Sequence, residues 1–241
     1  MINVNCDIGE RGVAHPTDDQ IMQCINIANI AVGGHAGNIQ SVNYYRNLAE
    51  KYHVKISVHL SYPDKENFGR TSLVISHKEL EKSLDQQYEL LSDIKTVKLH
   101  GALYNDCWTD KELASFIYGW LKTKGINEVI APGSSELAIL CKNSKAPDNI
   151  AVIAEVFAER NYQYVSSSKV LRLMPRTNKN ASIEECDSAV NHVNEIIENK
   201  AVNAFVDESA DRIFIPVISD TFCVHSDSLI ALELIKKLKN I

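Results

Sequence analysis

The sequence predicts an α/β fold in which about seven parallel strands form a closed or nearly closed barrel surrounded by helices. Apolar runs of strand length alternate with helical patterns along the chain, which is typical of a parallel sheet. Most of these runs end in a polar cluster, and the first is not followed by the GxGxxG motif of dinucleotide-binding sheets. We therefore expect residues 1–241 to form a single (β/α)-barrel domain.

The composition argues against nucleic-acid and membrane partners. The chain is 45% hydrophobic and 23% charged with a net charge of -6, and no basic tract is interleaved with aromatic residues. The start lacks the basic and apolar regions of a signal peptide, and no run of about 18 apolar residues is present. The six cysteines show no CxxC spacing, so we expect reduced, mostly buried thiols in a cytoplasmic protein rather than a zinc site.

The predicted strands are short and apolar, and most of them are followed directly by a glycine or by an ionisable residue. In chain order they are Ile2–Cys6, Ile25–Val32, Lys55–Val58, Thr96–Leu99, Val129–Ala131, Ala151–Ala154 and Thr221–Val224. A further pair of runs, Val202–Val206 and Ile213–Val217, flanks an acidic turn and predicts a small hairpin.

Helix starts are predicted from the capping box, a serine or threonine followed three residues later by glutamate. The pattern begins at Ser76, Thr109 and Ser182. After Thr109 the apolar residues recur at helical spacing, and Gly125 ends the stripe. We interpret these stripes as packing faces without a functional role.

The ionisable residues at the strand ends predict a shared pocket. In a parallel barrel the catalytic groups lie at the carboxyl ends of the strands. A lone histidine there is most often structural, but four of the eight histidines lie at the ends of different strands. The residues expected at this mouth are Asp7, His35, His59, His100, Glu155 and His225.

Lys98 and His100 are two residues apart and should point to the same space. We expect Lys98 to bind phosphate or a polarised carbonyl and to hold His100 neutral, so that His100 can position or deprotonate water. On this interpretation Lys98→Met lowers turnover with little loss of stability.

The segment from Phe157 to Thr177 interrupts the alternation of strands and helices. It carries Arg160 and Arg176, and a connection this long is usually functional or disordered. We expect a mobile lid that closes on an anionic group; the alternative is a solvated loop.

Several short motifs occur in a fixed order: Asn5–Glu10, Asn29–Asn38, Val58–Asp64, Phe68–Arg70, Lys98–Asn105, Glu155–Tyr162, Pro175–Arg176 and Asp220–His225. Together they resemble the LamB/YcsF family, whose fold is a (β/α) barrel related to the glycoside hydrolase/deacetylase barrels. The second motif departs from the family pattern at Val32, Gly34 and Asn38. These changes mostly alter the packing around the ionisable groups that the motifs retain, so they affect substrate shape more than chemistry.

The resemblance implies ATP-dependent hydrolysis of the 5-oxoproline lactam to L-glutamate, with this chain as the A subunit of a 5-oxoprolinase beside the 5-oxoprolinase B and C subunits. Phosphorylating the amide oxygen removes the resonance that protects the lactam. The reaction then needs cations for phosphate and the substrate carboxylate, and a base for water. No P-loop motif occurs, so ATP is expected to bind through the strand-end loops or partly through partner chains.

The residues expected to carry this chemistry fall into two sets. The expected catalytic residues are Asp7, His59, Lys98 and His100. The expected substrate- and phosphate-binding residues are His35, Asp64, Arg70, Tyr104, Asn105, Glu155, Arg160, Arg176, Asp220 and His225.

Two rival hypotheses remain. The chain could be a stand-alone deacetylase or amidase, with a divalent metal ion bound by Asp7, His59 and His100, or by His35 in place of one of them. The ammonium of Lys98 argues against this, because it would repel a nearby cation. The altered second motif favours the other rival, a non-catalytic paralogue that binds a lactam.

Overall fold

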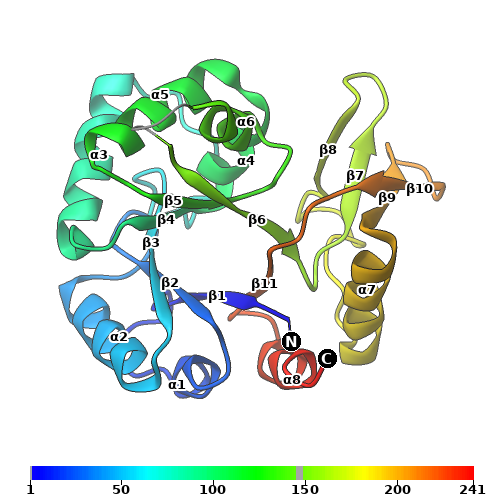
Figure 1. The fold of residues 1–241 in the computed structure, drawn as a ribbon, viewed down its shortest axis with the longest axis horizontal. Coiled ribbons are helices and arrows are strands. Elements are labelled where there is room, and N and C mark those ends of the chain that lie inside the picture. Colours follow the sequence, from blue (N-terminus) through cyan, green and yellow to red (C-terminus); the bar gives the residue numbers. More distant parts are fainter. Residues whose placement is uncertain (1, 145–148) are drawn as a thin grey trace.

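A computed structural model describes residues 2–144 and 149–241. Its main feature is a closed barrel of seven parallel strands, in the order β1-β11-β6-β5-β4-β3-β2 (Figure 1). The predicted α/β barrel is confirmed. Its strands are β1 (Val4–Ile8), β2 (Ile27–Ala31), β3 (Lys55–Leu60), β4 (Thr96–Leu99), β5 (Glu128–Ala131), β6 (Ala151–Phe157) and β11 (Thr221–His225).

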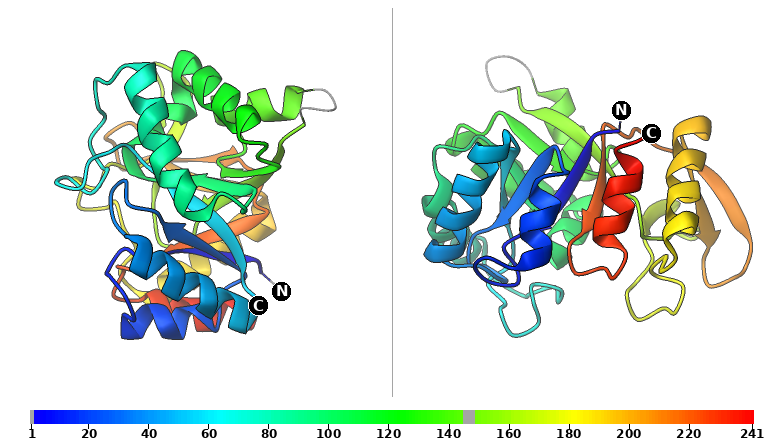
Figure 2. Two further views of the ribbon diagram at one scale, coloured as in Figure 1. Left: turned by 90° about the vertical axis from the view of Figure 1, so that its left-hand side faces the viewer. Right: turned by 90° about the horizontal axis from the view of Figure 1, so that it is seen from below.

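Most of the helices lie against the outside of the barrel, as the two side views show (Figure 2). None in the described residues is both long and apolar enough to cross a membrane. The helices are α1 (Pro16–Met22), α2 (Ile39–Tyr52), α3 (His77–Tyr88) with a short 3₁₀ turn after it (Glu89–Leu91), α4 (Gly101–Thr109), α5 (Lys111–Thr123), α6 (Glu136–Asn143), α7 (Cys186–Asn199) and α8 (Ala231–Leu238).

Of the three predicted capping boxes, only the one at Ser76 is confirmed, because its hydroxyl accepts from the backbone N–H of Glu79. The prediction at Thr109 is wrong by one residue: the Asp110 carboxylate caps α5. The prediction at Ser182 is also wrong. Ser182 pairs with Arg160 in an extended bridge, and the side chain of Glu185 caps α7 instead.

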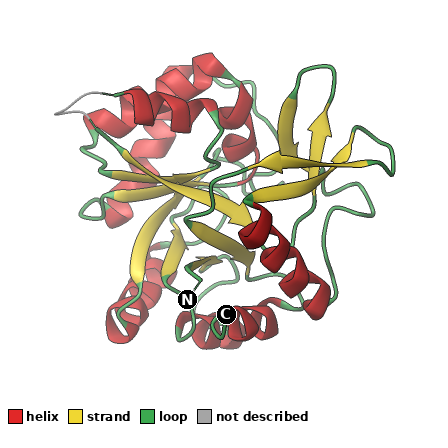
Figure 3. Cartoon of the chain, turned by 45° about the vertical axis from the view of Figure 1, so that its right-hand side comes forward, coloured by secondary structure: helices red, strands yellow, loops and turns green. Residues whose placement is uncertain are grey.

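A second sheet stands beside the barrel, with the order β10-β9-β7-β8 (Figure 3). Strands β9 (Ala201–Val206) and β10 (Arg212–Pro216) confirm the predicted hairpin. Strands β7 (Tyr162–Val165) and β8 (Val170–Leu173) form a second antiparallel hairpin. The segment expected to act as a lid therefore contains a hairpin, because the tyrosine- and valine-rich runs around Ser166–Ser168 pair with each other. Its closure on an anion stays a prediction.

Several barrel strands run further than their apolar runs predict. β1, β3 and β6 extend to Ile8, Leu60 and Phe157, so Asp7, His59 and Glu155 lie within strands rather than after them. On β1 the residues alternate, since Val4, Cys6 and Ile8 join the hydrophobic core while Asn5 and Asp7 contact polar groups. Polar partners inside the barrel make this continuation possible.

Lys98 is the centre of those polar partners and is only 2% exposed. Its Nζ lies 3.0 Å from Asp7 Oδ1 and 2.8 Å from Glu155 Oε1, and it donates to Asn5 Oδ1 at 3.2 Å and Cys223 Sγ at 3.0 Å. Burial disfavours the ammonium, but Asp7, Cys223 and Glu155 raise the pKa of Lys98 well above its usual value. One charged group thus joins four barrel strands.

This network reverses the expectation that Lys98→Met costs little stability. The substitution leaves Asp7 and Glu155 buried without their counter-charge, which should lower the free energy of unfolding by about 3–5 kcal/mol. Chemical denaturation checks this, with the exposed Lys111 replaced by Met as a control expected to change stability by less than about 0.5 kcal/mol. A loss for Lys98→Met below about 1 kcal/mol would contradict the central role of the pair.

The turn into α4 depends on Gly101, whose φ is +58°. A Cβ at this position would lie 2.3 Å from the backbone oxygen of Gly69, which accepts from Ala102 N–H. Gly101→Ala should therefore destabilise the protein by about 2 kcal/mol. Gly119 in α5 has open space around it, so Gly119→Ala should stabilise by about 0.5–1 kcal/mol. Thermal unfolding of both variants checks this, and equal effects would refute it.

Candidate functional site

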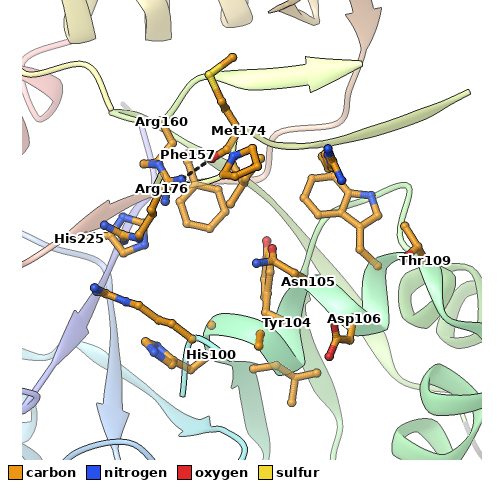
Figure 4. Close-up of a pocket in the computed structure, with 18 of the residues that line it drawn as sticks. His100, Tyr104, Asn105, Asp106, Thr109, Phe157, Arg160, Met174, Arg176 and His225 are labelled. Carbon is orange, nitrogen blue, oxygen red and sulfur yellow. Dashed lines mark hydrogen bonds between the residues drawn. The ribbon is translucent and has the colours of Figure 1, made fainter. Parts of the chain in front are cut away.

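A cavity of about 760 Å³ opens at the carboxyl ends of the barrel strands. Asp7, His59, Lys98, His100 and His225 are among its lining residues. Helix α4 forms one wall with Tyr104 and Asn105, and the β7–β8 hairpin and the segment after it form another (Figure 4).

Three histidines and one glutamate gather at the carboxyl ends of β1, β2, β3 and β4; we call them the histidine cluster. They are Glu10, His35, His59 and His100, and their ligand atoms lie within 4.8 Å of one another. Glu10 Oε1 lies 2.9 Å from His35 Nε2 and 3.4 Å from His100 Nδ1, and His59 Nε2 lies 3.1 Å from His100 Nδ1. The rings of His35 and His100 stack at 3.6 Å.

The environment of the histidine cluster favours neutral rings. Burial is the main cause that lowers the pKa of His35, and burial together with His35 and His59 lowers that of His100 well below its usual value. His100 is thus neutral near pH 7, as expected, but the expected cause is wrong. The ammonium of Lys98 is compensated by Asp7 and Glu155, so burial and the neighbouring rings lower this pKa.

Asp7 connects the polar barrel interior to the histidine cluster. Its Oδ1 is held by Lys98 at 3.0 Å and by Asn29 Nδ2 at 2.9 Å, and its Oδ2 lies 3.4 Å from His59 Nε2. Burial raises the pKa of Asp7, but His59 and Lys98 outweigh it, so the pKa lies well below its usual value. Asp7 therefore stays ionised and orients both neighbours.

Three arginines, which we call the arginine rim, surround the upper part of the cavity: Arg70, Arg160 and Arg176. Arg160 and Arg176 lie on the same wall, above His100 in Figure 4. Burial and Arg176 lower the pKa of Arg160 to about 10, and burial and Arg70 lower the pKa of Arg176. Mutual repulsion of this kind favours an anion between them.

The members of the arginine rim differ in how they are held. Arg160 donates to Met174 O at 2.7 Å and Ala181 O at 3.0 Å, so it anchors the chain after β8. Arg70 pairs with Asp227 at 3.0 Å. Arg176 lies at the surface beside these groups, which makes it the member of the rim best placed to meet a ligand.

The remaining expected residues at this mouth are supported by hydrogen bonds. Tyr104 donates to Glu155 Oε2 at 2.8 Å, and Asn105 lines the cavity from α4. His225 Nδ1 lies 2.5 Å from Glu159 Oε1, which also accepts from the backbone N–H of His225 at 3.0 Å. Glu159 thus fixes the orientation of this ring.

Two expected site residues lie elsewhere. Asp64 shapes the turn before Phe68, where its Oδ1 accepts from the backbone and side chain of Asn67. Asp220 precedes β11, at the opposite end of the barrel, and accepts from Ala154 N–H. Both were assigned because they belong to motifs that also contain site residues, but each satisfies a local backbone group instead.

Glu10 is the residue that the assignments from sequence missed. Glu10 follows the first strand in the same polar cluster as Asp7. The chain turns at Gly9, whose φ is +80°, directly before Glu10 contacts the histidines. The signal was an acid directly after a glycine at a strand end. A second group that could hold a metal ion comprises Asp7, Cys223 and His225, but Asp7 and Cys223 already contact Lys98.

Comparisons with known proteins agree with this fold. The chain is 32% identical to the 5-oxoprolinase A subunit of Haemophilus influenzae (strain PittGG), over 98% of this chain and 94% of that protein. It is 30% identical to the protein of that name from Vibrio cholerae, over 99% of this chain and 96% of that protein.

A lactam utilization protein of Thermus thermophilus has the same fold. Its structure superposes with a TM-score of 0.79 over 99% of this chain and 94% of that one, at 23% identity. The model of the LamB/YcsF family matches residues 2–241. From its first strand to its last helix, the chain belongs to the LamB/YcsF family.

Proposed function

We propose that this protein hydrolyses the lactam of 5-oxoproline to L-glutamate with ATP, as the single-domain A subunit of a complex that also contains the B and C subunits. The names of its relatives support this, and the family comprises hydrolases of cyclic amides. The observation that carries the proposal is that His59 and His100 of the histidine cluster line the same cavity as the three arginines of the rim.

The proposed chemistry begins when the γ-phosphoryl group of ATP moves to the amide oxygen of the lactam and ADP leaves. Water then adds to the activated ring carbon, and the C–N bond breaks with the nitrogen leaving as the amine. The resulting acyl phosphate takes up a second water and releases inorganic phosphate and L-glutamate. Each water must lose a proton, and the phosphoryl oxygens must be bound by cations.

The residues of the cavity match these needs. The buried rings of His59 and His100 can activate water, and the ionised Asp7 orients His59. Arg176 and the nearby Arg70 can bind the substrate carboxylate or phosphate. Lys98 is a positioning residue in this proposal, because it is buried between Asp7 and Glu155. We propose substrate contacts for Tyr104, Asn105 and His225 as well.

The same contacts strengthen a second candidate, a stand-alone metal-dependent deacetylase or amidase. The objection from Lys98 loses force, because two carboxylates already compensate its charge. The location of the ATP site distinguishes the candidates, since the B and C subunits would complete it only in the first.

The six free cysteines, five of them buried, support the proposal that the protein acts in the reducing cytoplasm.

The decisive assay measures glutamate released from 5-oxoproline, with and without ATP and the proteins encoded beside this one. We expect glutamate and ADP in equal amounts, and only when ATP and the partners are present. Release of glutamate without ATP would favour the stand-alone hydrolase. No release in the complete mixture, with intact folded proteins, would contradict the proposed function.

Arg176→Gln tests the arginine rim in the same assay. Loss of a charged hydrogen bond to the substrate should lower kcat/KM about ten- to a hundredfold. Stability should change by less than about 0.5 kcal/mol, because the side chain lies at the surface. Arg46→Gln, which breaks a surface ion pair between α2 and Asp93, serves as the matched control. Equal kinetics in the two variants would remove Arg176 from the substrate site.

A further inference from the structure

We propose that the histidine cluster binds a divalent transition-metal ion through Glu10 Oε1, His59 Nε2 and His100 Nδ1, while His35 Nε2, 2.9 Å from Glu10 Oε1, positions that carboxylate. The ring of His35 stacks on that of His100 at an interplanar angle of 1°, so these two rings do not direct lone pairs at the same ion. The role of the ion in catalysis rests on the proposed function, but the binding itself does not. The three ligand atoms belong to side chains at the ends of β1, β3 and β4. All three histidines are buried, at 5% exposure or less.

The tautomers of two histidines are set by backbone carbonyl groups. His59 Nδ1 lies 3.3 Å from Lys98 O, and His100 Nε2 lies 3.0 Å from Phe68 O. A carbonyl oxygen only accepts hydrogen bonds, so each of these nitrogens carries a proton. The opposite nitrogens, His59 Nε2 and His100 Nδ1, are therefore the ones that can present lone pairs to a metal ion.

Those two lone pairs face each other at 3.1 Å, an arrangement that needs a cation between them. One proton could join this pair, but it would leave the contacts of Glu10 Oε1 with His59 Nε2 at 3.8 Å and His100 Nδ1 at 3.4 Å unexplained. A single metal ion satisfies Glu10 Oε1, His59 Nε2 and His100 Nδ1 together. Bonding of the other ring nitrogen to a carbonyl oxygen is also the usual support of a metal-binding histidine.

The spacing of the ligand atoms suits such an ion. At metal–ligand distances of 2.0–2.1 Å, the edges of a tetrahedron measure about 3.3 Å. The distances among the three ligand atoms are 3.1, 3.4 and 3.8 Å, which bracket this value. Small side-chain movements would therefore complete the site.

The surrounding charges favour a divalent ion. Asp7, Glu10 and Glu155 contribute three carboxyl groups, and Lys98 contributes one ammonium held between two of them. Because two imidazoles and one carboxylate form the ligand set, Zn²⁺, Co²⁺ or Ni²⁺ should bind in preference to Mg²⁺. When bound, the ion acidifies a water molecule, so the cluster need not supply a free histidine base.

The test is a metal titration without substrate or ATP, on protein first stripped with a chelator. Calorimetry should give about one equivalent of Zn²⁺ or Co²⁺ per chain, and Co²⁺ should show visible absorption bands of a low-coordinate nitrogen–oxygen site. His59→Gln and His100→Gln should each weaken binding at least about tenfold. His35 is less suited to this test, since its Nδ1 is buried without a hydrogen-bond partner in the described residues.

His192→Gln is the matched control, because His192 is buried in α7 outside the cluster. Its titration should equal that of the parent, and circular dichroism of each variant should verify folding before titration. Saturable binding lost only in the cluster variants supports the site. No saturable binding by the parent, equal binding by folded His59→Gln, or equal affinity for Mg²⁺ would overturn the proposal. A failure of glutamate release would leave these results unaffected, so the two proposals fail separately.

Discussion

The ion pair between Lys98 and the carboxylates of Asp7 and Glu155 is the constraint on which the rest of the structure depends. A charge buried at the centre of a barrel is costly unless partners surround it. Here the partners come from β1, β6 and β11, while Lys98 itself comes from β4. The barrel interior is consequently polar, and its strands continue through positions where an apolar pattern would end.

This central pair also separates the charges of the cavity. Because Asp7 and Glu155 compensate the charge of Lys98 inside the barrel, its ammonium does not dominate the electrostatic potential of the cavity. The histidine cluster thus carries the carboxyl group of Glu10, while the arginine rim supplies positive charge to the same cavity. The segment after the β7–β8 hairpin contributes to this arrangement, since Arg160 fixes the chain that carries Arg176.

Sequence reasoning predicted the parallel barrel and most of its strands, because the alternation of apolar runs and helices reports backbone geometry directly. It also selected Asp7, His59 and His100, whose position at strand ends limits where they can lie. It failed where tertiary contacts decide. Asp64 and Asp220 satisfy nearby backbone groups, and Glu185 replaces Ser182 as a helix cap. Glu10 was missed because its contact with three histidines from other strands leaves no local pattern.

The position of β11 between β1 and β6 has a kinetic consequence. Thr221 Oγ1 donates to Asn3 O across 218 residues. The barrel therefore cannot close until β11, the last strand in the chain, has paired with β1. Pairings this distant in sequence form slowly, and a chain leaving the ribosome exposes the edges of β1 and β6 until nearly all of it has been made. Cys223 reaches Lys98 from the same late strand. The buried Lys98 ammonium therefore gains all of its partners only when the barrel closes, and a nascent chain has no complete cavity before that moment.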